Sequence, residues 1–186
     1  YYQSVYSNNH DDTIKDIGHA YLPHFEYGRN RDVLVLLSVL YMMYVFQQTN
    51  NWNLMNSYVM LLVVLYTLRL VCIQVTSLPI MERHRNNEEY MRKHCSATSD
   101  VTGGCNDFIF SGHTMLMVLS LLFAMYAQGS ISILMILYGV MTSLLIIGSH
   151  SHYTVDVVLA WVITFLVFST HLLYVNSQRF KSVFKF

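Results

Sequence analysis

Five long apolar runs determine what this chain can fold into. They cover roughly residues 33–47, 55–75, 108–127, 130–149 and 154–175. Each approaches the length of roughly 20 residues that a helix needs to cross a bilayer. The strands of a transmembrane barrel would alternate polar with apolar residues, and these runs do not. Because 54% of the residues are hydrophobic and only 12% are charged, the sequence predicts an all-α integral membrane protein, a multi-span helical bundle.

The ends and the charge of the chain add two expectations. The chain starts at Tyr1 without an initiator methionine or a signal-peptide pattern, so we expect an N-terminal segment to be missing and five spans to be a minimum. The formal net charge is zero, which gives no indication of a nucleic-acid partner. We therefore expect residues 1–186 to form one membrane-embedded domain whose partners are lipids.

The cysteines leave one question open. Cys95 and Cys105 bracket a polar loop and can form a disulfide if that loop is extracytosolic, whereas Cys72 lies inside an apolar run. No two cysteines have the CxxC spacing of a zinc or redox site. The sequence does not decide whether Cys95 and Cys105 pair.

Alternation of the spans sorts the polar segments onto two sides of the membrane. Residues 1–32, 76–107 and 149–156 share one side, and the turn at 48–56 lies on the other with the C-terminal tail. His113, His152 and Asp156 then lie at span ends on the first side, where Arg69 also ends its span. Ionisable groups in such positions are costly unless they are used, so we expect a functional site there.

The spacing of these groups indicates phosphoryl-group chemistry. His152 and Asp156 are four residues apart, which places them on one face of a helix that begins near Tyr153. A carboxylate that accepts from one imidazole nitrogen leaves the other nitrogen available as a nucleophile. Ser111 and Gly112 place His113 at a helix N-terminus, where free N–H groups favour an anion such as phosphate. A histidine beside a phosphate can protonate a leaving alkoxide and deprotonate an incoming alcohol.

Two simpler readings compete with this one. A zinc site of His113, His150, His152 and Asp156 suits the chemistry of the metal, but His150 and His152 point away from each other on a helix. We therefore expect no metal and no cofactor. Five further histidines are expected to be structural hydrogen-bonding residues: His19, His24, His84, His94 and His171.

The motifs 105-CNDFIFSGHT-114 and 152-HYTVD-156 resemble the paired motifs of sphingomyelin synthases and their relatives, a branch of the type 2 phosphatidic acid phosphatase superfamily. The stretches 69-RLVCIQVTSLP-79 and 16-DIGHAYLP-23 also look like segments of that family. The chain departs from the first motif at Asn106, where the family usually has glycine. The likeness runs from about residue 16 to 175.

The resemblance implies a six-span bundle, with the first span absent here, and a catalytic triad of His113, His152 and Asp156. It implies transfer of a phospho-headgroup, with phosphocholine favoured, from a glycerophospholipid to ceramide through a phosphohistidine, with release of diacylglycerol. Substrate or phosphate binding is assigned to five further residues: Arg69, Asp107, Ser111, Gly112 and Tyr153.

Departures from the wider superfamily bear on the acceptor and the headgroup. Its phosphatases usually show K-x6-R-P and S-R-x5-H, but Ile146 stands where the arginine of the second motif would be. A lipid phosphatase or phospholipase C-like hydrolase is therefore the second hypothesis, and a non-enzymatic scramblase, channel or ceramide sensor the third. Animal sphingomyelin synthases tend to have an acidic residue where this chain has Ser151, which leaves inositol and ethanolamine headgroups open.

Orientation is a point of conflict. The site side carries Lys15, Arg29, Arg31, Arg83, Arg85, Arg92 and Lys93, and the other side carries Arg179, Lys181 and Lys185. The positive-inside rule would make the site side cytosolic. The resemblance implies the opposite, with a site facing the lumen or exterior in the Golgi, endoplasmic reticulum or plasma membrane, and we follow it because basic loops near a phosphate site have another use.

Overall fold

Every regular element that the structure describes is a helix. The computed structural model describes residues 16–24, 28–75 and 109–184, with side chains at 16–24, 30–75 and 109–177. The elements are α2 (Ile17–Tyr21), α3 (Gly28–Thr49), α4 (Trp52–Val75), α7 (Gly112–Gln128), α8 (Ile133–Gly148) and α9 (Thr154–Phe184). These ranges contain no strand, which confirms the all-α prediction. Cys95, Cys105 and Asp107 lie outside the described residues, so their predicted roles stay predictions.

Five helices follow the five apolar runs, but they differ in length. The segments Asn30–Thr49, Trp52–Val75 and Thr154–Ser177 are long and apolar enough to cross a membrane. Helices α7 and α8 are apolar but shorter, with 17 and 16 residues. At 1.5 Å per residue each spans roughly 25 Å, somewhat less than the bilayer core.

The turn between α7 and α8 explains why these two helices are short. Gly129 ends α7 in the left-handed conformation (φ 63°), and its N–H and that of Ser130 donate to carbonyls of the last turn. Glycine adopts this conformation without strain and commonly closes a helix in this way. The next helix begins only after Ser132, so the short connection between the two helices takes residues from the ends of both apolar runs.

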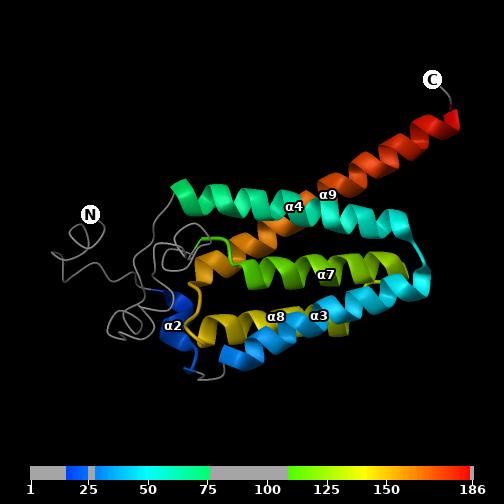
Figure 1. The fold of residues 1–186 in the computed structure, drawn as a ribbon. Helices are drawn as coiled ribbons and strands as arrows, with labels where there is room; N and C mark the ends of the chain where they lie inside the picture. The colour runs from blue at the N-terminus through cyan, green and yellow to red at the C-terminus, as the bar shows by residue number, and fades with distance from the viewer. Residues whose placement is uncertain (1–15, 25–27, 76–108, 185–186) are drawn as a thin grey trace.

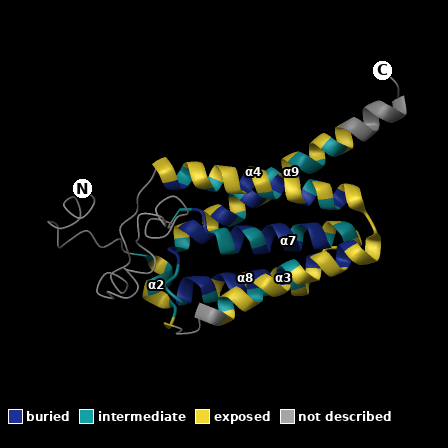
Figure 2. Cartoon of the chain, viewed as in Figure 1, coloured by how far each residue is buried: buried dark blue, intermediate teal, exposed yellow. Residues whose placement is uncertain are grey.

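Helix α7 is the centre of the bundle and packs against α3, α4, α8 and α9 (Figures 1 and 2). It is buried along most of its length, whereas the other long helices expose one side (Figure 2). The main apolar cluster joins α7 to α3, α4 and α9 through a group of large side chains: Met42, Phe46, Leu65, Met115, Leu119, Phe123 and Phe168. A helix that is apolar on all sides is typical of the middle of a membrane bundle.

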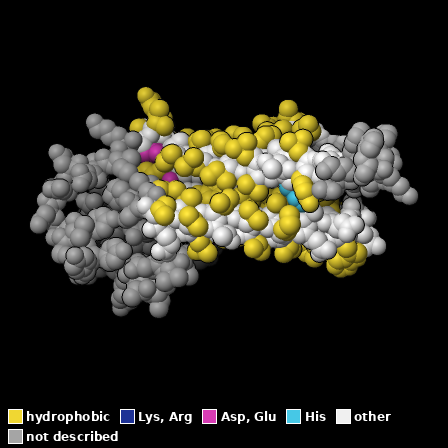
Figure 3. All heavy atoms as spheres, turned by 90° about the horizontal axis from the view of Figure 1, so that it is seen from above, with side chains coloured by type: hydrophobic (Ala, Val, Ile, Leu, Met, Phe, Trp, Pro, Cys, Tyr) yellow, Lys and Arg dark blue, Asp and Glu magenta, His cyan; other side chains and the backbone are white. Residues whose placement is uncertain are grey.

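The outer surface of the bundle is apolar as well. Leucine and valine side chains of α3, α4, α8 and α9 are exposed, including Leu36, Val63, Leu137 and Val162. The space-filling view shows hydrophobic side chains spread over the face seen from above (Figure 3). Such a surface suits lipid rather than water, and together with the long apolar helices it makes this a membrane protein.

The helices alternate in direction, so the starts of α3, α7 and α9 lie at the same end as the ends of α4 and α8 (Figure 1). Helix α2 lies at this end too, against α8 and α9. The turn between α3 and α4 lies at the opposite end (Figure 1). Of the polar segments sorted by alternation, the described residues 28–32 and 149–156 lie at one end and the turn at 48–56 at the other, as expected, while residues 1–15 and 76–107 lie outside the described residues.

Candidate functional site

The structure brings His113 and His152 together at one end of the bundle. His113 is the second residue of α7, and His152 lies two residues before α9. The centroids of their rings are 5.9 Å apart, with the ring planes tilted by 60°. The two side chains differ in exposure, because that of His113 is 38% exposed and that of His152 only 7%. One histidine is therefore reachable from outside, and the other is held in the protein.

Asp156 lies behind His152, as the spacing predicts. His152 Nδ1 is 3.7 Å from Asp156 Oδ2, and the aspartate side chain is fully buried. This distance is somewhat longer than a hydrogen bond. Among the described residues, neither His152 Nδ1 nor Asp156 Oδ1 has a hydrogen-bond partner. Buried polar atoms without a partner are costly, which suits residues that are kept for a function.

Asp156 also fixes the start of its own helix. Its Oδ2 accepts a hydrogen bond of 2.9 Å from the backbone N–H of Tyr153. A carboxylate in the first turn that reaches back to the residue before the helix satisfies one of the unpaired N–H groups there. Tyr153 is itself buried, at 4% exposure. The residue predicted to orient His152 is thus held by the backbone just beyond that histidine.

Burial controls the protonation of His152. The loss of solvent, helped by the positive charges of Arg31 and Arg69, lowers the pKa of His152 from 6.5 to about 3. The imidazole is therefore neutral at pH 7, as a nitrogen nucleophile must be.

Ser111 and Gly112 build the start of α7, but in different ways from each other. Ser111 is fully buried and caps the helix, accepting from the N–H of Thr114 at 3.3 Å. Its own N–H donates to the backbone carbonyl of Asp156 at 3.3 Å, which ties α7 to the first turn of α9. Its observed contacts are those of a helix cap, and its predicted binding of phosphate stays a prediction.

Gly112 makes room for Arg69. A Cβ atom at Gly112 would lie 3.1 Å from both Cζ and Nε of Arg69, which is tighter than an ordinary contact. Arg69 Nε also donates to the backbone carbonyl of Phe110 at 3.2 Å. The guanidinium therefore lies against the start of α7, beside Gly112, the residue that precedes His113. A positive charge at a helix N-terminus forms a suitable place for an anion.

Asp32 is a site residue that the sequence did not reveal. It lies in the second turn of α3, and its Oδ1 lies 3.2 Å from His113 Nε2. The same oxygen accepts from Arg31 Nε at 2.8 Å. In the sequence, Asp32 reads only as the polar end of an apolar run. An acidic residue at a span end on the site side was the available signal.

The histidines expected to be structural include one that borders the site. His19 Nε2 lies 3.1 Å from the backbone carbonyl of His152, and its ring stacks on that of His150 at 4.2 Å. His150 therefore faces α2 rather than a shared centre with His113. Among the described residues, no three histidine, cysteine, aspartate or glutamate side chains are grouped so that they could hold a metal ion.

Comparisons with known proteins cover the part of the chain that carries these residues. Residues 104–173 match the family described as PAP2 superfamily C-terminal. Over 61 residues, 31% of this chain and 18% of the relative, the chain is 48% identical to phosphatidylinositol:ceramide inositolphosphotransferase of Oryza sativa subsp. indica. Over 139 residues, 63% of this chain and 33% of the relative, it is 30% identical to phosphatidylcholine:ceramide cholinephosphotransferase 1 of Homo sapiens.

The matched regions set the scope of these comparisons. The chain spans about a third of the length of the human relative and less than a fifth of that of the rice relative. The family match includes both histidines, Asp156, and the whole of α7 and α8. Residues 104–173, which carry His113, His152 and Asp156, are therefore similar to the PAP2 superfamily.

Proposed function

We propose that the chain carries the active site of a phospholipid headgroup transferase, which moves a phospho-headgroup from a glycerophospholipid to ceramide and releases diacylglycerol. One observation carries the proposal: a buried, neutral His152 faces a more exposed His113 at 5.9 Å between ring centroids, with Asp156 behind His152. The relatives named as ceramide phosphotransferases support the same reaction class.

In the first step, His152 attacks the phosphorus of the donor lipid. Asp156 is nearest to Nδ1, so Nε2 is the nitrogen that forms the new bond to phosphorus. The bond between phosphorus and the glycerol oxygen breaks, and protonated His113 gives its proton to the departing alkoxide. Diacylglycerol leaves, and the headgroup stays on His152 as a phosphohistidine.

In the second step, ceramide takes the place of diacylglycerol. Neutral His113 accepts the proton of the primary hydroxyl, and the oxygen attacks phosphorus as its bond to His152 breaks. A nucleophile and a proton donor each act at about 3 Å from the atoms they engage. Two rings roughly 6 Å apart can therefore hold one phosphoryl group between them, on opposite sides.

The start of α7 is the better of two helix N-termini for binding the phosphate. The start of α9 already has two carboxylates, since Asp16 accepts from the N–H of Thr154 and Asp156 from that of Tyr153. The start of α7 instead has Arg69 beside Gly112. A phosphate there would meet a guanidinium and a helix dipole of the right sign, close to His113. Asp107 remains a proposed contact from outside the described residues.

Asp32 is proposed to orient His113. The carboxylate lies 3.2 Å from Nε2 and is itself held by Arg31. A carboxylate in this position stabilises the protonated imidazole that the first step needs. It would also raise the basicity of His113 for the second step.

The headgroup is a finer question than the reaction class. The two named relatives use different headgroups, inositol and choline. We favour phosphocholine, with inositol and ethanolamine as alternatives. The alternatives stay open because Ser151 stands where animal sphingomyelin synthases tend to have an acidic residue. The hydroxyl of Ser151 lies 2.8 Å from that of Ser149. Hydrolysis, with water in place of ceramide, is the second candidate function because it needs the same two histidines.

One assay separates these alternatives. Purified protein in detergent receives choline, ethanolamine and inositol phospholipids together, with and without a fluorescent ceramide, and the products are identified by mass spectrometry. A phosphosphingolipid that forms only with ceramide supports the transferase and names the headgroup. Free phospho-headgroup or phosphate formed without ceramide supports the hydrolase. Absence of any product from all donors would contradict both.

We propose that the site faces the lumen or the exterior, in the Golgi, endoplasmic reticulum or plasma membrane. The basic residues of the site side argue for the cytosol by the positive-inside rule, but one of them, Arg31, lies at the site, where it binds Asp32 and its charge acts on His152. Glycosylation tags placed within residues 84–100 test the orientation. Modification of the tag supports a lumenal site, and its absence with a modified control tag in the C-terminal tail contradicts it.

A further inference from the structure

Helix α2 is held to the start of α9 by a dense set of hydrogen bonds across 138 residues of sequence. Asp16 Oδ2 accepts from the N–H of Thr154 at 2.8 Å, and Asp16 Oδ1 accepts from the Thr154 hydroxyl at 2.7 Å. The same carboxylate caps α2 by accepting from the N–H of His19 at 3.0 Å. One buried side chain, 7% exposed, therefore starts two helices at once.

Helix α2 lies directly against the loop that joins α8 to α9, residues 149–153, and against the first residue of α9. The N–H of Gly18 donates to the Thr154 hydroxyl at 3.1 Å. A Cβ atom at Gly18 would collide with Thr154 Oγ1 and with Ile147 Cγ2, at the end of α8. Only glycine fits here, because its backbone lies directly against the residues on both sides of the loop.

His19 reaches the residue that carries the proposed nucleophile. Its Nε2 donates to the backbone carbonyl of His152 at 3.1 Å, because a carbonyl can only accept. The ring of His19 also stacks on His150, with planes 11° from parallel and centroids 4.2 Å apart. His150 has a left-handed backbone (φ 52°), which is strained for a residue with a side chain and persists only where its surroundings hold it.

The loop is thus fixed from two directions. On one side, the N–H of Ser111 at the start of α7 donates to the carbonyl of Asp156. On the other side, α2 binds the backbone at both His152 and Thr154. The side chain of His152 has no hydrogen bond at Nδ1 to any described residue, so the contacts of its backbone contribute to its position.

We propose that α2 is a clamp that sets the position of His152, with Asp16 and His19 as positioning residues. The clamp itself stands on the contacts above, and its effect on turnover rests on the proposed function. Reaction rates fall by about 100-fold when a reacting group moves by about 1 Å, so a loosened clamp should slow the chemical step. Binding of ceramide, which does not touch these residues in the proposed mechanism, should change little.

Hydrogen exchange in the full chain tests the clamp without reference to activity. In Asp16→Asn, an amide NH₂ replaces one of the two accepting oxygens, so the backbone N–H groups of residues 150–157 should exchange at least tenfold faster. The matched control is Tyr21→Ala on the same helix, since Tyr21 is 82% exposed, and it should leave exchange of that segment unchanged. Equal exchange in Asp16→Asn and wild type would overturn the clamp.

Kinetics test its effect on His152. Asp16→Asn should lower kcat by about 10- to 100-fold per folded molecule while the KM for ceramide stays within about twofold. His19→Phe keeps a ring to stack on His150 but loses the Nε2–H group that donates to the carbonyl of His152, so it should lower kcat as well. This second variant tests the clamp if Asp16→Asn does not fold. The kcat of Thr154→Ser, which keeps the hydroxyl, should be near that of wild type. The kcat of Thr154→Val, which loses the hydroxyl, should fall.

The outcomes separate failure of the clamp from failure of the proposed function. A rise in KM with unchanged kcat, or rates that fall only in proportion to the folded fraction, would overturn the positioning role. If the wild type makes no phosphosphingolipid, the proposed function fails, and the exchange experiment still decides whether α2 holds the loop.

Discussion

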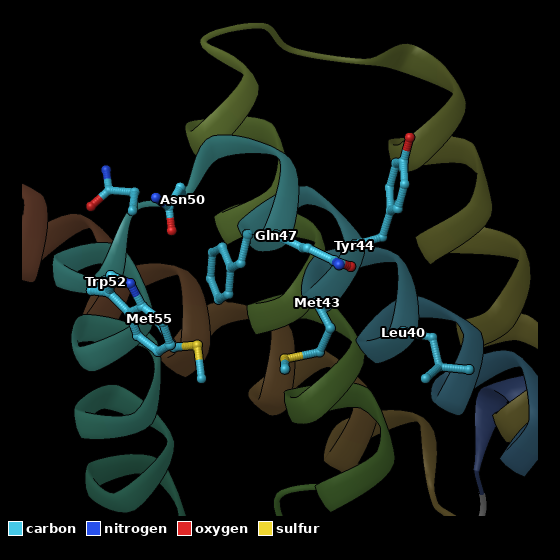
Figure 4. Close-up of a pocket in the computed structure, with 9 residues that line it drawn as sticks. Leu40, Met43, Tyr44, Gln47, Asn50, Trp52 and Met55 are labelled. Carbon is cyan, nitrogen blue, oxygen red and sulfur yellow. The ribbon is translucent and has the colours of Figure 1, made fainter.

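The two ends of the bundle are built from different chemistry. The end with α2 and the starts of α7 and α9 holds four ionisable residues in a row of contacts. Asp32 lies next to His113, His113 next to His152, and His152 next to Asp156. The opposite end, at the turn between α3 and α4, has a pocket of about 470 Å³ lined by Tyr44, Gln47, Asn50, Trp52 and Met55 among others. Its labelled side chains come from α3, the turn and α4, and none is ionisable near neutral pH (Figure 4).

This difference shows that polar character alone does not mark a reactive site in a membrane protein. The carboxamides and aromatic rings of the pocket suit a membrane–water interface, where they hydrogen bond with water and pack against lipid. Ionisable groups with partly satisfied hydrogen bonds, as at His152 and Asp156, are costly and therefore indicate use. If this view is correct, substitutions at the two ends should differ in kind.

The largest difference is expected for His152→Ala. Loss of the nucleophile removes the covalent step, so the rate of phosphosphingolipid formation should fall by at least about 1000-fold, and no phosphorylated protein should be trapped. The rate is measured per folded molecule in detergent, with Tyr21→Ala as the control. A fall of tenfold or less would mean that His152 is not the nucleophile, and the proposed difference between the ends would lose its main support.

Acid pH should destabilise the protein through the site end. Burial and the charges of Arg31 and Arg69 lower the pKa of His152 to about 3 in the folded protein, against 6.5 ordinarily. Between these values the unfolded chain binds more protons, so stability falls as the pH falls below 6.5. The slope can reach about 1.4 kcal/mol per pH unit, which gives up to about 2 kcal/mol between pH 6.5 and 5.

Thermal unfolding in detergent at pH 7.5 and 5 measures this effect. His152→Asn removes the group and should reduce the loss of stability between the two pH values. Asp16 should not contribute in this range. Burial alone would raise its pKa, but hydrogen bonds from Thr154 and His19 lower it below 3.8, so its stabilisation is lost only at more acid pH. An unchanged pH dependence in His152→Asn would show that other groups dominate.

Asp32→Asn should have an intermediate effect. The amide keeps the size of the side chain but loses the charge that stabilises protonated His113, so kcat should fall by about tenfold. The alkaline limb of the pH–rate profile should also move to lower pH, because the first step needs protonated His113 and the variant holds that proton less tightly. A fall in rate without a change in this profile would assign Asp32 a structural role only.

The sequence predicted those parts of the site that depend on local spacing. The helical nature of the apolar runs follows from their length and composition, and the proximity of His152 and Asp156 follows from four residues at the start of a helix. His113 and His152 come from different helices, and alternation of the spans was enough to place them at the same end. The motif stretches supplied their identity as a pair.

Contacts made by tertiary packing were not predictable in this way. Asp16 lies 138 residues from Thr154, and only the docking of α2 brings the two together. Asp32 read as the polar end of a span because nothing in its own neighbourhood points to His113. The burial of Ser111 and its bond to the backbone of Asp156 depend on how α7 meets α9. Such roles are set by packing between helices and have no local signature.

The smallest effect is expected at the opposite end, for Gln47→Leu. Gln47 lines the pocket at the turn between α3 and α4 and is exposed, so its loss should change the free energy of unfolding by no more than about 0.5 kcal/mol. The rate of phosphosphingolipid formation should stay within about twofold of wild type, and the loss of stability between pH 7.5 and 5 should be unchanged. A tenfold fall in rate would show that this pocket takes part in substrate binding, and the two ends would then have to be treated as one functional unit.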